Sequence, residues 1–423
     1  MRRPVAIFTA IAAALTMSQF MRAAMSVVAP DIMAEARLTP EAYGNMAGAF
    51  FLGVAVAQIP TGIMFDRFGA RLTITSTLVL AALGTFAFSV ADGFATLFAS
   101  RFVIGVGFAS ALMGGLVVAA RWFPPDRFSL VTGLFIAVSA AVGLMGAATP
   151  MAWVAAAIGW RAAFAGAGVL TLGAAALVWA LVRDAPPGHP WHRRRTENAR
   201  EILQGYLIIL RLPGLAWVMM MAAVGYSTMI TLIGVWGGPY LHDVHGLDGI
   251  ARGNVLSAMV AGSVVGLLVY GPLDRWVDSR KYVVIGGVLA SAALLSSLAA
   301  LGHPSLVLVT VLFALYGVIG SYYITNITLG RAHYPDHLVG RGVTTVNLCT
   351  FIGVVAVQFA SARLMGAFDA AMPGAPLPES AYRILFGALA VYALVAGLLY
   401  FRTRDVRPST ERARAKTADS GAK

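Results

Sequence analysis

The sequence predicts an all-α membrane protein with twelve transmembrane helices, because of its composition, its long charge-free stretches and an internal duplication. Hydrophobic residues make up 59% of the 423-residue chain, charged residues only 12%, and the mean hydropathy is +0.77. A soluble domain of this size needs far more charged residues to cover its surface. We therefore expect the chain to be embedded in a lipid bilayer.

The charge-free stretches are long enough to form helices that cross a membrane, for which about 20 mostly apolar residues suffice. Residues 5–30, interrupted only by Arg22, form the first predicted helix. A signal peptide is the rival interpretation, but another span follows directly. Gly302, His303 and Pro304 divide the longest stretch into two helices. The stretches that complete the set of twelve are 42–65, 72–91, 102–120, 128–160, 162–182, 212–242, 253–273, 282–330, 342–362 and 384–401.

The basic residues predict how the helices are oriented. The chain has 31 Lys and Arg against 19 Asp and Glu. If both termini are cytoplasmic, most of the basic residues fall on the inner side, as the positive-inside rule requires. The preference for Arg over Lys is typical of GC-rich bacterial genomes. We expect a multi-pass protein of the bacterial inner membrane with cytoplasmic termini. No soluble segment carries a basic patch with interleaved aromatic residues, which argues against nucleic acid as a partner.

The two halves of the chain repeat each other. Asp66-Arg67 recurs as Asp274-Arg275, and Pro30 recurs as Pro239, at nearly the same separation. This self-similarity indicates a duplicated six-helix unit. We expect two six-helix bundles related by pseudo-twofold symmetry, over residues 1–182 and 212–402. A cytoplasmic linker is predicted at 183–211 and a disordered basic tail at 403–423.

The segment GIMFDRFGAR at 62–71 resembles the signature loop of the major facilitator superfamily of transporters. RFVIGVGFA (101–109), RWFPPDR (121–127) and GWRAAF (159–164) are similar to other segments of that family. The resemblance covers residues 5–402 and implies the family's fold and rocker-switch alternating access around a midplane site. It implies a transporter of a small molecule, with no enzymatic activity and no cofactor. We expect the protein to be a monomer.

The resemblance gives this loop a gating role. Two glycines allow close helix approach and a sharp turn, and the charged residues can pair with groups at the inner ends of other helices. The alternative is an anchor that only fixes topology. The candidate gating residues are Gly62, Asp66, Arg67, Gly69 and Arg71, with Asp274 and Arg275 as their counterparts in the second half.

Two arginines inside predicted spans are the main candidates for binding a substrate. A cation near the bilayer centre costs about 2.5–3.5 kcal/mol even on the lenient scale, so it normally faces a cavity or a partner. Arg22 lies in the first span and Arg101 in the fourth, and every Asp and Glu lies outside the spans or at their ends. A substrate anion could therefore supply the missing negative charge. In the alternative interpretation, both arginines bind backbone carbonyls and serve packing.

The segment RAAMSVVAP at 22–30 resembles the first helix of the organic-anion and organophosphate branches of the family, in which the arginine at this position binds the anion. Thr231 occupies the position that corresponds to Arg22 in the second half, so a single arginine favours a monoanion such as a carboxylate. Gln19 lies on the Arg22 side of its helix. The other polar candidates for the cavity are Tyr226, Ser227, Thr231, Trp236, Tyr322, Tyr323, Asn326 and Asn347.

Two other functions remain open at this stage. Proton-driven efflux of amphipathic compounds normally uses a carboxylate within the spans, and none occurs here. A sensor with the same fold would need an output surface. His242 with His245, and His333 with His337, have short spacings, but such spacings arise readily, and we predict no metal site.

Overall fold

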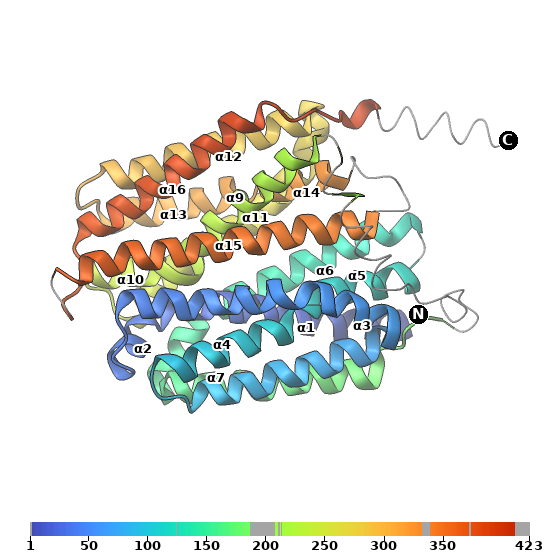
Figure 1. Ribbon diagram of the computed structural model, residues 1–423, viewed down its shortest axis with the longest axis horizontal. Coiled ribbons are helices and arrows are strands. Elements are labelled where there is room, and N and C mark those ends of the chain that lie inside the picture. Colours follow the sequence, from blue (N-terminus) through green and yellow to red (C-terminus); the bar gives the residue numbers. More distant parts are fainter. Residues whose placement is uncertain are drawn as a thin grey trace.

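A computed structural model describes residues 2–123, 125–186, 208–209, 212, 214–331, 339–371 and 374–410 (Figure 1), and their side chains except at 2–4, 125–130, 339–341 and 343. These residues are mostly helical and include no strand, which confirms the all-α fold class. The helices of the first half are α1 (Arg2–Val27), α2 (Ala29–Glu35), α3 (Pro40–Ser89), α4 (Phe94–Phe108), α5 (Ser110–Trp122), α6 (Pro125–Gly146) and α7 (Thr149–Leu181). Those of the second half are α9 (Leu215–Thr231), the π-helix η2 (Leu232–Trp236), α10 (Gly237–Asp243), α11 (Gly249–Val277), α12 (Arg280–Ala300), α13 (Leu306–Gly320), α14 (Tyr323–Arg331), α15 (Val339–Asp369) and α16 (Glu379–Tyr400).

Ten stretches of the described residues are long and apolar enough to cross a membrane, and two of them hold two spans each. Pro40–Ser89 and Val131–Leu181 contain 50 and 51 residues, more than twice the length of about 20 residues that one crossing needs. Gly69 (φ 81°) and Gly159 (φ 82°) interrupt the helical geometry, in a conformation that glycine adopts without strain. Divided at these glycines, the described stretches give the twelve expected spans.

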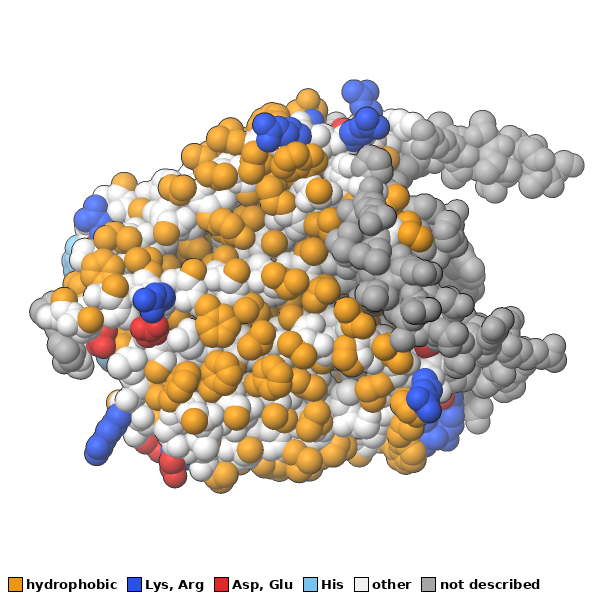
Figure 2. Space-filling view, viewed as in Figure 1, with side chains coloured by type: hydrophobic (Ala, Val, Ile, Leu, Met, Phe, Trp, Pro, Cys, Tyr) orange, Lys and Arg blue, Asp and Glu red, His pale blue; other side chains and the backbone are white. Residues whose placement is uncertain are grey.

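The two halves lie side by side, the first drawn from blue to green and the second from yellow-green to red (Figure 1). We call the end that carries α2 and α10 the α2 end, and the opposite end, where α1 begins and α16 ends, the terminal end. Figure 2 shows hydrophobic side chains over the middle of the molecule and charged side chains mainly towards its two ends. This distribution matches a protein whose middle faces lipid.

The halves are joined by hydrogen bonds at the α2 end. The Gly238 amide of α10 donates to Ser26 Oγ of α1 over 2.8 Å, and Thr149 Oγ1 of α7 donates to Asn254 Oδ1 of α11 over 2.9 Å. Helices α1 and α10 are so close that a Cβ on Gly238 would lie 1.7 Å from the Ser26 carbonyl oxygen. The α2 end is therefore closed.

Replacing Gly238 by alanine should hold the α2 end open, because the added methyl group overlaps the Ser26 carbonyl. Ala152, which is 2% exposed beside α11, can report this opening as a cysteine in a Cys349→Ser background. We expect Ala152→Cys to react several-fold faster with an impermeant thiol reagent in the Gly238→Ala variant. Gly286→Ala is the control, since nothing lies near its added methyl group. Equal labelling in both variants would contradict the close approach.

Candidate functional site

Arg22 lies between the two halves and has weak protein partners. Its side chain belongs to α1, and the residue is 8% exposed. One Nη donates to Tyr226 Oη of α9 over 3.3 Å, and the other to Ser18 Oγ over 3.5 Å, both near the upper limit for a hydrogen bond. Its Nε is buried and has no partner. A guanidinium has five N–H donors, so most of the hydrogen-bonding capacity of Arg22 is unused.

Aromatic rings from both halves surround the Arg22 guanidinium. Its Cζ lies 5.9 Å from the centre of the Phe51 ring in α3 and 5.2 Å from that of Phe351 in α15. The Tyr323 ring of α14 stands edge-on to Tyr226, with 5.3 Å between the ring centres. Such rings stabilise a cation through their faces, and each contact contributes about 0.5–2 kcal/mol. We call Ser18, Arg22, Phe51, Tyr226, Tyr323 and Phe351 the Arg22 box.

No carboxylate neutralises Arg22. Within the described part of the chain, the ion pairs connect other arginines and histidines to Asp or Glu, and none includes Arg22. A buried guanidinium without a counter-ion pays a desolvation penalty that rings and hydroxyl groups offset only in part. The site is therefore suited to an anion that enters from water.

Arg101 occupies a different position from Arg22. It is 1% exposed, and both of its Nη atoms donate to the carbonyl oxygen of Met21 over 3.2 Å. Its Cζ also lies 5.0 Å from the centre of the Phe50 ring. Because Met21 directly precedes Arg22, Arg101 holds the backbone from which the Arg22 side chain projects. Arg101 thus lies beside the box rather than in it, bonded to the backbone from which Arg22 projects.

The remaining predicted substrate residues lie in three different surroundings. Tyr226 lies in the box. Gln19 packs against Gly143 of α6, and Thr231 is fully buried with no partner for its hydroxyl group. The structure places Tyr322 and Asn326 away from the box, inside the second bundle.

Tyr322 and Asn326 are both held by neighbours in that bundle. Tyr322 packs against Gly225 and Gly287, while Asn326 donates to the Val218 carbonyl over 3.0 Å and accepts from Tyr400 Oη over 2.7 Å. Their expected common face therefore points into the bundle, and Tyr323, the next residue to Tyr322, is the one in the box.

The predicted gating loop is attached to the end of α7. Gly69 has the positive φ described above, and the Arg71 amide donates to Asp184 Oδ1 over 2.8 Å. Arg71 Nε donates to the Trp179 carbonyl over 2.8 Å, and its guanidinium lies 4.0 Å from the Trp179 ring centre. Gly62 has open space beside it, and Asp66 and Arg67 are exposed.

The second half has a related attachment. Asp274 is 6% exposed and pairs with Arg280 over 3.1 Å, while Arg275 is exposed. Asp405, which follows α16, accepts from the Lys281 amide over 3.1 Å and from Ser279 Oγ over 2.6 Å. Asp405 thus repeats the contact that Asp184, which follows α7, makes in the first half.

A comparison with known protein families identifies the family to which these loops and paired bundles belong. A family model described as the Major Facilitator Superfamily matches residues 11–357 and 249–421, in two overlapping alignments that cover nearly the whole chain. The chain belongs to the major facilitator superfamily. The match confirms the resemblance to this family that was noted for the segment 62–71.

Individual superfamily members are similar to this chain over part of their length. A protein of Agrobacterium vitis named "Putative tartrate transporter" is 25% identical over 294 residues, 65% of each chain. The "Membrane sensor protein UhpC" of Salmonella typhimurium is 26% identical over 273 residues, 60% of each chain. The chain thus spans less than two thirds of these curated relatives. The crystal structure of a D-xylose-proton symporter shares the fold, with a TM-score of 0.70 and 15% identity over 92% of this chain and 97% of that one. The family is one of transporters, not of enzymes.

The loop contacts of Asp184 and Asp405 were not predicted, although the sequence contains a signal for them. Each follows an arginine directly after the last helix of its half, as Arg183-Asp184 and Arg404-Asp405. Within the predicted tail, Ser409 donates to the Asp278 carboxylate over 2.7–2.9 Å. Residues 411–423 and most of the predicted 183–211 linker lie outside the described residues.

Of the two histidine pairs, His242 with His245 lies among the described residues. No group of three or more His, Cys, Asp or Glu able to hold a metal ion occurs in the part of the chain that was described, and His333 and His337 lie outside it. His242 pairs with Asp243, while His245 stacks on His303 with 5.8 Å between the ring centres. Burial and the neighbouring His303 lower the pKa of His245.

Removing either of the two loop-binding carboxylates should destabilise its own half. A hydrogen bond to a charged group contributes about 1.5–3 kcal/mol, so Asp184→Asn and Asp405→Asn should each lower the midpoint of thermal unfolding in detergent by several degrees. Asp92→Asn is the control, because the side chain of Asp92 is 91% exposed in its pair with Arg161 and contributes little. If all three variants unfold at the wild-type temperature, the two contacts do not hold the loops.

Proposed function

We propose that this protein is a secondary transporter of a small organic anion, with Arg22 as the residue that binds the charge. The observation that carries this proposal is the buried guanidinium of Arg22, which lies between the two halves without a carboxylate partner. An intramembrane charge of this kind normally marks a substrate pathway. A solute anion would form charge-assisted hydrogen bonds with the unused N–H groups.

The chemistry of the Arg22 box favours a carboxylate with a single charge at the site. Arg22 can hold one carboxylate through two parallel N–H···O bonds. Arg101 is engaged with the Met21 carbonyl, and Thr231 offers only a hydroxyl group at the position that corresponds to Arg22. Ser18 and Tyr226 add hydroxyl groups suited to a hydroxy acid. The name of the Agrobacterium vitis relative supports a hydroxycarboxylate, although tartrate itself carries two carboxylates.

Alternating access would expose the box to each side of the membrane in turn. The hydrogen bonds at the α2 end close one side, so the described state corresponds to access from the terminal end. With the orientation that the basic residues predict, the terminal end faces the cytoplasm of a bacterial cell. The 62–71 loop and its counterpart around Asp274 would then close the cytoplasmic side in the opposite state.

Removing the charge of Arg22 should abolish high-affinity transport. We expect Arg22→Ala to raise the KM for the carboxylate at least tenfold, since the lost hydrogen bonds are worth about 1.5–3 kcal/mol and 1.4 kcal/mol corresponds to a factor of ten. The measurement is counterflow in proteoliposomes with lactate, glycerate, tartrate, glucose and a quaternary amine as solutes. Arg402→Gln, which removes an exposed arginine at the terminal end, is the control. Transport of a neutral or cationic solute that survives Arg22→Ala would contradict the proposal.

A sensor is the second candidate, because of the similarity to a membrane sensor protein. Deleting residues 411–423, which keeps the Asp405 and Ser409 contacts, separates the two functions. A transporter of the proposed kind should retain wild-type counterflow after this deletion. A full-length protein that binds a carboxylate at the Arg22 box but gives no counterflow, with or without the tail, would favour the sensor.

A further inference from the structure

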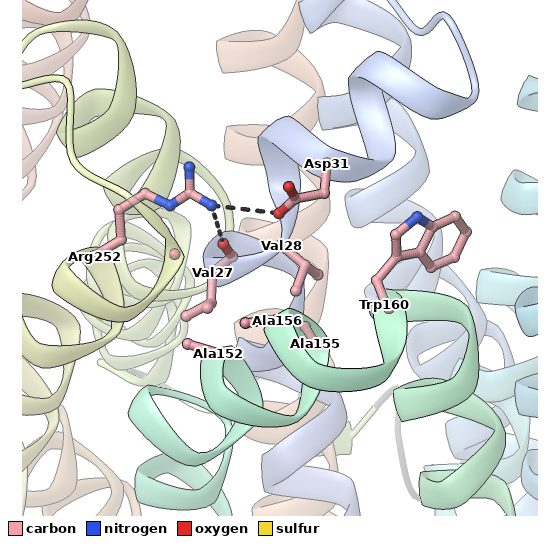
Figure 3. A pocket seen from close by; sticks show the side chains of 10 residues that line it. Val27, Val28, Asp31, Ala152, Ala155, Ala156, Trp160 and Arg252 are labelled. Carbon is pink, nitrogen blue, oxygen red and sulfur yellow. Dashed lines mark hydrogen bonds and ion pairs between the residues drawn. The ribbon is translucent and has the colours of Figure 1, made fainter.

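Arg252 is a second buried cation at the boundary between the halves. It lies in the first turn of α11, and its side chain is only 4% exposed. Its Nη2 donates to the Val27 carbonyl over 3.0 Å and to Asp31 Oδ2 over 3.3 Å (Figure 3). Val27 belongs to α1 and Asp31 to α2, so both partners come from the opposite half.

Two carboxylates of its own half, Asp248 and Asp243, lie near enough to interact electrostatically with Arg252, but no hydrogen bond joins either of them to it among the described residues. Asp248, four residues earlier, accepts from the Ala251 amide over 2.8 Å and so caps α11. The other nearby acid, Asp243, is bonded to His242 and to Tyr382. Arg252 Nε is buried without a partner. Among the described residues, the carboxylate that hydrogen-bonds Arg252 is therefore that of Asp31, across the boundary.

A cavity of about 300 Å³ adjoins this ion pair. Figure 3 shows Arg252 reaching from α11 towards Val27 and Asp31, with α7 along another wall. Residues that line it include Val28, Asp31, Ala155, Ala156, Trp160 and Arg252. The volume is at the lower end of the range for small-molecule sites. The side chain of Asp31 is 58% exposed, so its carboxylate can turn into water at little cost.

Opening of the α2 end would separate Arg252 from Val27 and Asp31 at the same time. The guanidinium would then remain in its own half without the carboxylate that hydrogen-bonds it in the closed state, with Asp248 and Asp243 as its only nearby described carboxylates. An anion arriving from the water on that side could replace the Asp31 carboxylate. Such an anion binds the open state better than the closed one, so it shifts the population towards the open state.

We propose that Arg252 forms an entry site for the carboxylate substrate at the α2 end, which the Asp31 carboxylate occupies in the closed state. The proposal rests on the transport function proposed above. Substrate would first bind at Arg252 and then reach Arg22, deeper between the halves. Asp31 is a competitor for the same guanidinium, so release of Asp31 and binding of substrate are linked.

The neighbouring pair of Arg161 with Glu35 provides a matched control. Glu35 lies one turn after Asp31 in the same helix, and Arg161 Nε contacts its Oε1 over 2.5 Å. The hydrogen bond from Arg161 lowers the pKa of the Glu35 carboxyl group. Both residues belong to the first half, so this pair stays together when the halves part.

The test compares Asp31→Asn with Arg252→Gln. Transport is measured in right-side-out and inverted bacterial membrane vesicles, with whichever of lactate, glycerate and tartrate the wild type carries fastest. If Arg252 is an entry site, the two variants change in opposite directions the KM measured with substrate added on the α2 side. We expect this KM to rise at least tenfold in Arg252→Gln and to fall several-fold in Asp31→Asn. The KM from the terminal side, measured on the same preparations, should change less than twofold, which shows that each variant is folded. Glu35→Gln should leave both KM values at the wild-type level.

An ion pair with a purely structural role predicts a different result. If the ion pair only fastens the halves, either variant breaks it, and both shift the KM from the α2 side in the same direction. That result, or a wild-type KM in Arg252→Gln, overturns the entry site while leaving Arg22 as the central site. If the proposed transport function is itself wrong, the result is different, because Arg22→Ala would then leave transport unchanged.

Discussion

The desolvation of positive charge between the two halves is the constraint on which the rest of the structure depends. A guanidinium that leaves water must find acceptors or a counter-ion. The protein meets this demand differently at each of its three buried arginines in the described boundary region. Arg101 has a backbone carbonyl, Arg252 has a carbonyl and a carboxylate from the other half, and Arg22 has two distant hydroxyl groups. The least satisfied of the three lies where the halves meet.

The three arginines differ in whether their contacts would change when the two bundles move. Arg101 is bound within its own half, so its contacts survive any movement between the bundles. Arg22 and Arg252 each have a partner across the boundary, so their surroundings change when the bundles move. Glycines such as Gly238 let the helices approach closely enough for these contacts to form. Rigid bundles with a few polar contacts between them are suited to switching between two arrangements.

The sequence alone was sufficient to predict the fold and the charge of Arg22 within the first span. Hydropathy, the positive-inside bias and the repeated Asp-Arg pair predicted the helices and the bundles, because lipid imposes these patterns on every span. A charged residue within an apolar run stands out, so Arg22 and Arg101 were found. The Arg22 box was only partly predictable, since Phe51 and Phe351 look like any other apolar residues of a span. Tyr322 and Tyr323 are adjacent, and small changes of helix rotation at the start of α14 decide which of them faces Arg22. Arg252 lies just outside the charge-free stretch 253–273, and its burial could not be predicted, because it depends on α1 and α2, far away in the sequence.

The paired contacts of Asp184 and Asp405 bear on the history of the chain. Each carboxylate reaches back to a loop of its own half, so neither contact requires the covalent connection between the halves. An ancestral six-helix chain that ended in Arg-Asp would have carried this contact before the gene duplicated. Two such chains could then have met as a symmetric dimer, with the same surface on each partner. Fusion into one polypeptide freed the halves to diverge, and a single Arg22 opposite Thr231 is what such divergence would leave.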